Sequence, residues 1–123
     1  MKITATHHVG LFTPNFETMK SFYTETLGLP IAKTWTDPDI IFLAAGDTLI
    51  ELVDKKDFGL SDARPAGFDH FAFHVESVDE TFAELVEAGI TIEIEPRDFK
   101  DVRIAFFRDP DGNLLELVED PRK

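Results

Sequence analysis

The sequence predicts an α+β fold in which two similar βαβββ modules stand in tandem and their mixed sheets curl into a cup. Three observations predict it. Strand-like and helix-like periodicity alternates in the same order twice, a glycine ends each helical stretch, and the last strand of each half carries nearly the same residues. We expect one domain over residues 1–123, with modules at 1–54 and 68–123 joined by a linker at 55–67.

The first half reads strand, helix, strand, strand, strand. Residues 5–12 predict a strand, and apolar residues recur at helical spacing between positions 16 and 27. Asn15 is expected to cap this helix, and Gly28 to end it. Three more strands, separated by turn residues, are predicted at Pro30–Thr36, Ile40–Ala45 and Thr48–Val53.

The second half repeats that order. A strand is predicted at Asp69–Val75, and Ser77 with Glu80 forms a capping-box pattern that begins a helix ending at Gly89. The apolar face of that helix is predicted to consist of Val78, Phe82, Leu85 and Val86. The last three strands are predicted at Ile90–Glu95, Val102–Phe107 and Leu114–Glu119.

The repeat extends to individual residues. The segment Thr48–Asp54 shares Leu, Glu, Leu and Val with Asn113–Glu119 at matching positions. His8 and His70 each stand early in the first strand of their half. They are roughly 60 residues apart, which is nearly the same separation as that between the two matching segments. The chain is therefore interpreted as two copies of one module.

Composition excludes several classes of function. The 12 basic and 24 acidic side chains give a formal net charge of −12, which repels phosphate backbones and anionic lipid head groups. No cysteine is present, so any metal must bind through nitrogen and oxygen. No apolar run approaches the roughly 20 residues of a membrane span. We expect a cytoplasmic protein that acts on a small molecule and binds neither nucleic acid nor a membrane.

Four side chains at equivalent positions of the two modules form a candidate site. His8 and His70 lie in the first strands, while Glu51 and Glu116 lie in the last strands among Leu and Val, where an isolated carboxylate is costly. Taken singly, such a histidine can be a hydrogen-bonded structural residue and such a glutamate can point to water. If the modules pair by pseudo-twofold symmetry, the four converge, and two imidazoles with two carboxylates suit a divalent ion with open positions. One glutamate could then act as a general base.

Two other histidines compete for roles in this site. His7 and His8 point to opposite faces of a strand, so only one can face the metal, and the symmetry with His70 favours His8. His74 shares a face with His70, but it lies roughly 13 Å further along the strand at about 3.3 Å per residue. It is interpreted either as pocket lining or as a structural histidine.

Several motifs carry a resemblance to a known family. They are His8-Val9, Phe22-Tyr23 with Leu27-Gly28-Leu29, Ile50-Glu51-Leu52, Asp69-His70-Phe71-Ala72-Phe73 and the stretch from Asp109 to Leu117. Together they make the whole chain similar to the vicinal oxygen chelate superfamily of glyoxalases, bleomycin resistance proteins and dioxygenases, and most similar to glyoxalase I-like metalloenzymes.

The resemblance implies a metal held by His8, Glu51, His70 and Glu116. Nickel or zinc is the implied ion, with cobalt, manganese or iron as alternatives. The implied activity is that of a lactoylglutathione lyase-like lyase or isomerase, which forms an enediolate from a substrate with vicinal oxygens, such as the hemithioacetal of a thiol and a 2-oxoaldehyde. Glu116 is the expected base and Glu51 the second candidate. Proteins of this fold usually pair, so we expect a homodimer.

The substrate pocket is expected to differ from that of glutathione-using relatives, which place arginine or asparagine at positions matching Phe12, Lys55 and Ala66. A different thiol adduct or a more apolar substrate is therefore expected. The predicted pocket residues are Phe12, Trp35, Phe42, His74 and Arg103. Two other functions stay open: a non-catalytic ligand-binding or drug-resistance protein of this fold, and a metalloenzyme similar to methylmalonyl-CoA epimerase or to the dioxygenases.

Overall fold

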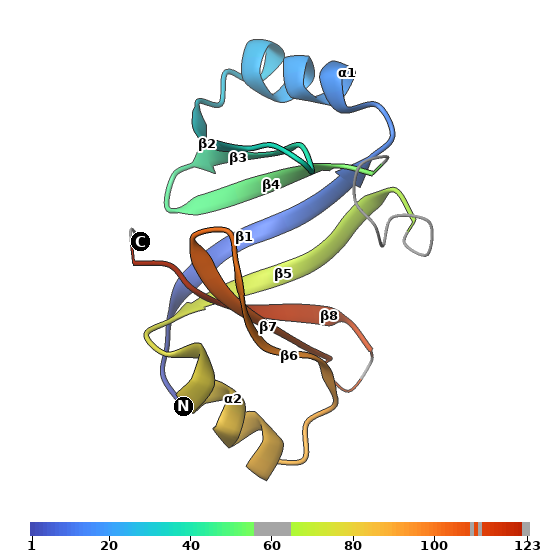
Figure 1. Cartoon of the computed structure of the whole chain (residues 1–123). Coiled ribbons are helices and arrows are strands. Elements are labelled where there is room, and N and C mark those ends of the chain that lie inside the picture. Colours follow the sequence, from blue (N-terminus) through green and yellow to red (C-terminus); the bar gives the residue numbers. More distant parts are fainter. Residues whose placement is uncertain (56–64, 109, 111, 122–123) are drawn as a thin grey trace. The chain divides into compact units, whose positions relative to one another are not determined.

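The computed structural model of the chain describes residues 1–55, 65–108, 110 and 112–121, and it divides into two compact units (Figure 1). The 8–69 unit consists of His8–Asp69, and the 70–123 unit consists of His70–Lys123 together with Met1–His7. The elements in chain order are β1 Ile3–Thr13, α1 Phe16–Ser21, the π-helical segment η1 Phe22–Thr26, β2 Ile31–Trp35, β3 Ile40–Ala45, β4 Thr48–Asp54, β5 Gly67–Val75, α2 Val78–Glu87, β6 Ile92–Phe99, β7 Val102–Arg108 and β8 Leu114–Glu119.

Among the described residues, the strands form an eight-stranded mixed sheet, which confirms the predicted α+β class. In the 8–69 unit the strand order is β2-β3-β4-β1, and in the 70–123 unit β5-β8-β7-β6 follows the first residues of β1. The first and last strands of each half pair in parallel, β1 with β4 and β5 with β8. The hairpins β2-β3-β4 and β6-β7-β8 are antiparallel. The element order repeats as the sequence predicted.

The sheet of the 8–69 unit carries its helical segment on one face (Figure 1). The core on that face consists of Leu11, Ile41, Leu43 and Leu52, with Phe16, Met19, Tyr23, Leu29 and Ile50 packed against it. Strand residues alternate between faces, so Glu51, next to Leu52, points to the other face. The helical segment therefore does not cover the face of this sheet that carries Glu51.

The helical segment of this unit differs from the single helix that the sequence predicts. It changes from α to π geometry after Ser21, with the Leu27 amide donating to the Phe22 carbonyl at 3.0 Å. The Thr24 hydroxyl donates to the Lys20 carbonyl at 2.7 Å, a side-chain bond that competes with the helical ladder. Asn15 is the N-cap residue of α1, as predicted, but its side chain makes no capping bond, and the Asn15 amide donates to Thr13 Oγ1.

In the 70–123 unit, α2 packs on a core of Val75, Val78, Leu85, Ala105 and Leu117. The Ser77 side chain accepts from the Glu80 amide at 3.2 Å, which confirms the predicted cap. The predicted apolar face is wrong at Val86, which is 52% exposed. Thr81 is buried instead and donates its hydroxyl to the Ser77 carbonyl, so polar Thr81 takes a place on the inward face that hydrophobicity alone does not reveal.

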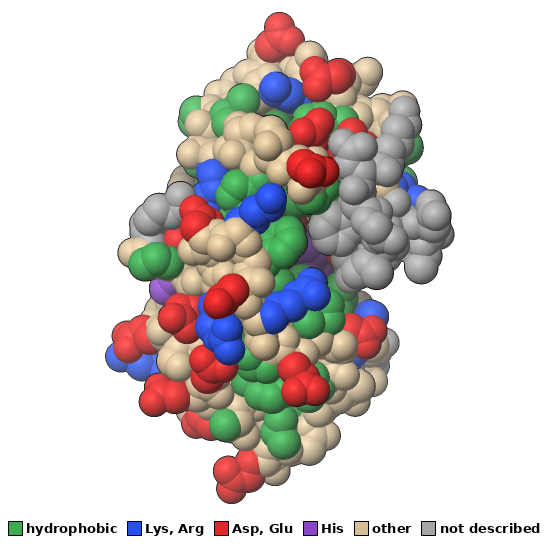
Figure 2. All heavy atoms as spheres, in the orientation of Figure 1, with side chains coloured by type: hydrophobic (Ala, Val, Ile, Leu, Met, Phe, Trp, Pro, Cys, Tyr) green, Lys and Arg blue, Asp and Glu red, His purple; other side chains and the backbone are tan. Residues whose placement is uncertain are grey.

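The predicted linker falls largely on residues 56–64, which lie outside the described residues; β5 already begins at Gly67. Acidic side chains are spread over the face drawn in Figure 2, in keeping with the net charge of −12. Within the described residues, no helix is long and apolar enough to cross a membrane.

Candidate metal centre

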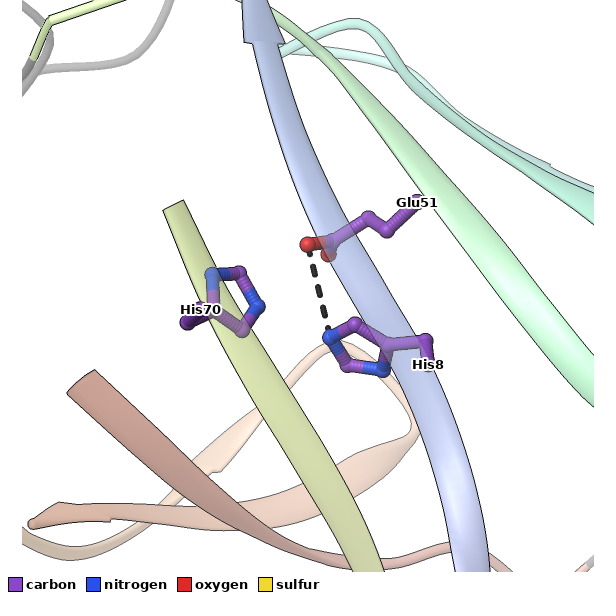
Figure 3. A group of neighbouring side chains, drawn as sticks. All are labelled: His8, Glu51 and His70. Atoms are coloured by element: carbon purple, nitrogen blue, oxygen red, sulfur yellow. Dashed lines mark ion pairs between the residues drawn. The ribbon is translucent and has the colours of Figure 1, made fainter. Parts of the chain in front are cut away.

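One histidine and one glutamate meet on the helix-free face of the 8–69 unit. The parallel register of β1 and β4 sets Gly10 against Glu51, and His8 lies two residues before Gly10 on the same face. His8 Nε2 lies 3.4 Å from Glu51 Oε1, and both residues are buried. Figure 3 shows the two side chains pointing toward one another from their strands.

A second pair has the same construction in the 70–123 unit. The parallel register of β5 and β8 sets Ala72 against Glu116, with His70 two residues before Ala72. His70 Nε2 lies 3.2 Å from Glu116 Oε1, and these residues are also buried. The two units therefore each present one imidazole and one carboxylate in the same strand geometry, as the sequence repeat predicts.

An aromatic ring supports each histidine, a feature that sequence reasoning found in only one half. Phe42 is paired with Glu51 across β3 and β4 and meets the His8 ring edge-on, with centroids 5.5 Å apart. Phe106 is paired with Glu116 across β7 and β8 and meets the His70 ring in the same way, also at 5.5 Å. Phe42 was among the predicted pocket residues but Phe106 was not. Their equivalent places in the repeat were the signal that could have found it.

The chemistry of these donors fits a divalent cation. Neutral imidazole nitrogens and carboxylate oxygens are ligands that zinc, nickel, cobalt, manganese and iron accept. Glu51 and Glu116 are 8% and 5% exposed, and a buried carboxylate is costly unless a positive charge or hydrogen bonds compensate it. When the imidazole is neutral, the carboxylate is the charged group of each pair, and a bound cation would balance its negative charge.

His7 points away from His8 and makes a different buried contact. Its Nε2 donates to Asp120 Oδ2 at 2.9 Å, with the two side chains 2% and 5% exposed. His74 stacks against His7 with ring centroids 6.2 Å apart. His74 Nε2 donates to the Asp120 carbonyl at 3.0 Å, and His74 Nδ1 lies 2.8 Å from Thr4 Oγ1. Both ring nitrogens of His74 thus have protein partners, which favours its structural interpretation over pocket lining.

The remaining predicted pocket residues lie in different surroundings. Phe12 is buried on β1, on the same face as His8 and Gly10. Trp35 is half-buried and meets the Phe42 ring edge-on at 5.1 Å. These two positions are compatible with a pocket beside His8 and Glu51.

Arg103 lies on the other face of its strand. Residues 103 and 106 of β7 point to opposite faces, so Arg103 faces α2 and Phe106 faces Glu116. Its guanidinium donates to both carboxylate oxygens of Asp79 and to Asp98, at 2.9 to 3.0 Å. These bonds raise the pKa of Arg103 and lower the pKa of Asp79 from its usual 3.8. We therefore leave Arg103 out of the proposed site.

Comparison with known proteins identifies the family and agrees with the fold. Residues 5–117 match the sequence profile of the Glyoxalase/Bleomycin resistance protein/Dioxygenase superfamily. The uncharacterized protein YwkD of Bacillus subtilis is 34% identical over 127 residues, covering 97% of this chain and 99% of that protein. The lactoylglutathione lyase of Escherichia coli O157:H7 is 28% identical, covering 92% and 90% of the two chains. A solved methylmalonyl-CoA epimerase from Streptomyces coelicolor has the same fold, with a TM-score of 0.84 at 22% identity and coverage of 98% and 96%.

Proposed function

Because the chain belongs to the Glyoxalase/Bleomycin resistance protein/Dioxygenase superfamily, we propose that it is a metal-dependent lyase or isomerase of the glyoxalase I type. The observation that carries the proposal is the repeated pair of a buried histidine and a buried glutamate, present in full in both halves. The similarity to lactoylglutathione lyases supports the choice within the superfamily.

In this proposal His8, Glu51, His70 and Glu116 together hold one divalent ion. Two nitrogen and two oxygen donors leave positions open for water or substrate on a six-coordinate ion. Nickel and zinc are the proposed ions, and cobalt, manganese and iron are the alternatives. Phe42 and Phe106 contact the two imidazoles edge-on and so limit how far each ring can rotate.

The proposed substrate is a small molecule with oxygens on adjacent carbons, such as a hemithioacetal of a thiol and a 2-oxoaldehyde. A bound divalent ion would supply Lewis-acid chemistry that makes the hydrogen on the carbon beside a substrate oxygen more acidic. Glu116 takes the proton from one carbon and returns it to the neighbouring carbon, and Glu51 is the second candidate for this base. The buried setting of Glu116 keeps water from competing for that proton.

The thiol of the substrate is proposed to differ from glutathione, because Phe12 and Ala66 offer no group that pairs with a carboxylate. Phe12 is buried on the His8 face of β1, so it supplies an apolar wall there. The proposal includes a homodimer, as the family resemblance implies, and a cytoplasmic location.

The test combines metal content with activity. After exhaustive dialysis, elemental mass spectrometry should find about one transition-metal ion per wild-type chain. Glu51→Ala should lose most of it, whereas Glu17→Ala, which removes an exposed glutamate of α1, should keep it. Hemithioacetals prepared from methylglyoxal and a panel of thiols should be converted by the metal-loaded wild type.

The Glu116→Gln variant separates binding from catalysis. We expect it to retain part of the metal and to lose turnover by roughly a hundredfold or more, the usual contribution of a general base. Wild-type turnover in this variant would overturn the assignment of Glu116. A wild type that binds no metal would instead favour a ligand-binding protein of the same fold. Iron with oxygen-dependent turnover would favour a dioxygenase-like enzyme.

A further inference from the structure

One aromatic side chain of β5 lies open to solvent. Phe68 is 78% exposed, the largest exposed fraction among the large hydrophobic residues that the structure describes. Phe71 of the same strand is 38% exposed, and its ring lies 5.4 Å from that of Phe73. A phenylalanine ring left in water gains none of the free energy that burial of apolar surface provides. The stability of the fold therefore does not account for a phenylalanine at position 68.

Phe68 lies on the face of β5 that carries a candidate metal ligand. Residues two apart in a strand share a face, so Phe68 lies on the same face as His70. His70 Nε2 lies 3.2 Å from Glu116 Oε1. Two residues of strand separate Phe68 from His70 by roughly 6.6 Å, at about 3.3 Å per residue. Because both residues belong to one strand, this relation follows from strand geometry alone.

The burial along this face gives a direction for the substrate. Beyond His70 the face continues with Ala72, which is fully buried, whereas on the other side of His70 it continues with the exposed Phe68. A group attached to a molecule bound at His70 therefore finds open space toward Phe68. The separation of roughly 6.6 Å also lies within the range of about 4.5–7 Å at which two aromatic rings pair.

The charge of the molecule favours an uncharged group at this place. The candidate ligands include the carboxylates of Glu51 and Glu116, and the whole chain has a net charge of −12. An anionic substituent beside them would be repelled, whereas an apolar ring would not.

We propose that Phe68 is a specificity-determining residue that binds an aromatic ring of the substrate. This inference rests on the proposed function, because it assumes that the vicinal oxygens of the substrate lie at the metal centre beside His70. It narrows the substrate class to molecules in which an aromatic group is joined directly to the carbons that carry those oxygens. In the complex, that group covers the apolar surface of Phe68.

Two hydroxamates are suitable probes, since each chelates a metal ion through two neighbouring oxygens. They differ in the group on the carbonyl carbon, which is methyl in acetohydroxamate and phenyl in benzohydroxamate. Isothermal titration of the metal-loaded protein gives the phenyl preference as the ratio of the two dissociation constants. This ratio should be roughly tenfold larger in the wild type than in a variant without the ring, equivalent to about 1.4 kcal/mol.

Three variants separate ring recognition from other effects. Phe68→Thr removes the ring but keeps a residue suited to a strand, so it should lose the extra preference and keep acetohydroxamate affinity and metal content. Phe68→Tyr keeps the ring and should keep the preference. Phe71→Thr changes the opposite face of β5, and as the matched control it should have the wild-type ratio.

Light scattering on each variant completes the test. An unchanged ratio in Phe68→Thr would overturn the inference. A ratio that falls only where Phe68→Thr also breaks an oligomer would assign Phe68 to a contact with a second copy, and would overturn it as well. A wild type that binds metal and acetohydroxamate but not benzohydroxamate would overturn the inference and leave the proposed function standing. A wild type that binds neither metal nor hydroxamates would overturn both.

Discussion

Removing Asp120 should destabilise the protein strongly without emptying the metal site. The Asp120 carboxylate and the His7 ring are almost fully buried and meet at 2.9 Å. Truncating one partner of a buried pair leaves the other desolvated and typically costs about 3–5 kcal/mol. For Asp120→Ala we expect a loss of about 3 kcal/mol in the free energy of unfolding and a fall of roughly 10 °C in Tm.

A double-mutant cycle measured by urea unfolding would test the reasoning. His7→Ala should cost about as much as Asp120→Ala, and the double variant should cost about 2 kcal/mol less than the sum because both lose the same contact. Asp98→Ala, which removes an exposed carboxylate from Arg103, is the control and should change stability little.

Metal content measured on variants of the two neighbouring histidines distinguishes their roles. His7→Ala should keep its metal at a temperature where it is folded, whereas His8→Ala should lose most of it. Strictly additive single effects would refute the buried pair, and loss of metal from His7→Ala would refute the division of roles between His7 and His8.

Three further predictions concern the 70–123 unit and its surface. Ser77→Ala should lower the free energy of unfolding by about 1 kcal/mol by removing the acceptor for the Glu80 amide, and Ser77→Asp should restore it in urea titrations; no loss in Ser77→Ala would contradict the cap. Leu117→Ala should cost about 2–5 kcal/mol, because Leu117 is fully buried beneath α2, whereas Leu27→Ala at an exposed site should cost far less; equal effects would contradict the core assignment. The lowered pKa of Asp79 means that the folded state holds its carboxylate charged more strongly than the unfolded state does, so its small stabilisation is present above its ordinary pKa of 3.8 and is lost as the pH falls through the lowered value. Tm measured from pH 6 to roughly pH 2 should therefore fall less steeply in Asp79→Asn than in the wild type, and parallel curves would contradict this.

Much of the fold could be predicted because the two halves repeat the same signals. Alternating strands and glycine-ended helices gave the correct element order, and the bounds of β3 and β8 agree with the prediction. The prediction was wrong where side chains compete with the backbone. Thr24 bonds to the Lys20 carbonyl near the change to π geometry, and the Asn15 amide donates to Thr13 Oγ1 while the Asn15 side chain makes no capping bond. Hydropathy carries no information on such bonds.

The candidate site could be predicted as two pairs, because strand alternation fixes which residues share a face. It separated His8 from His7, and the repeat linked Glu51 to Glu116. Arg103 was included as a nearby basic residue, but the sequence does not show that Asp79 and Asp98 bind it.

The division of β1 between the two units bears on how the protein could be taken apart. A gene cut at the sequence repeat would give one fragment with both Thr4 and His7 and another with His74 and Asp120, which those two residues contact. Each half would then carry polar groups whose partners are on the other polypeptide. The repeated stretch of sequence is therefore not the unit that can stand alone, and split versions of the protein should regain their fold only when both fragments are present.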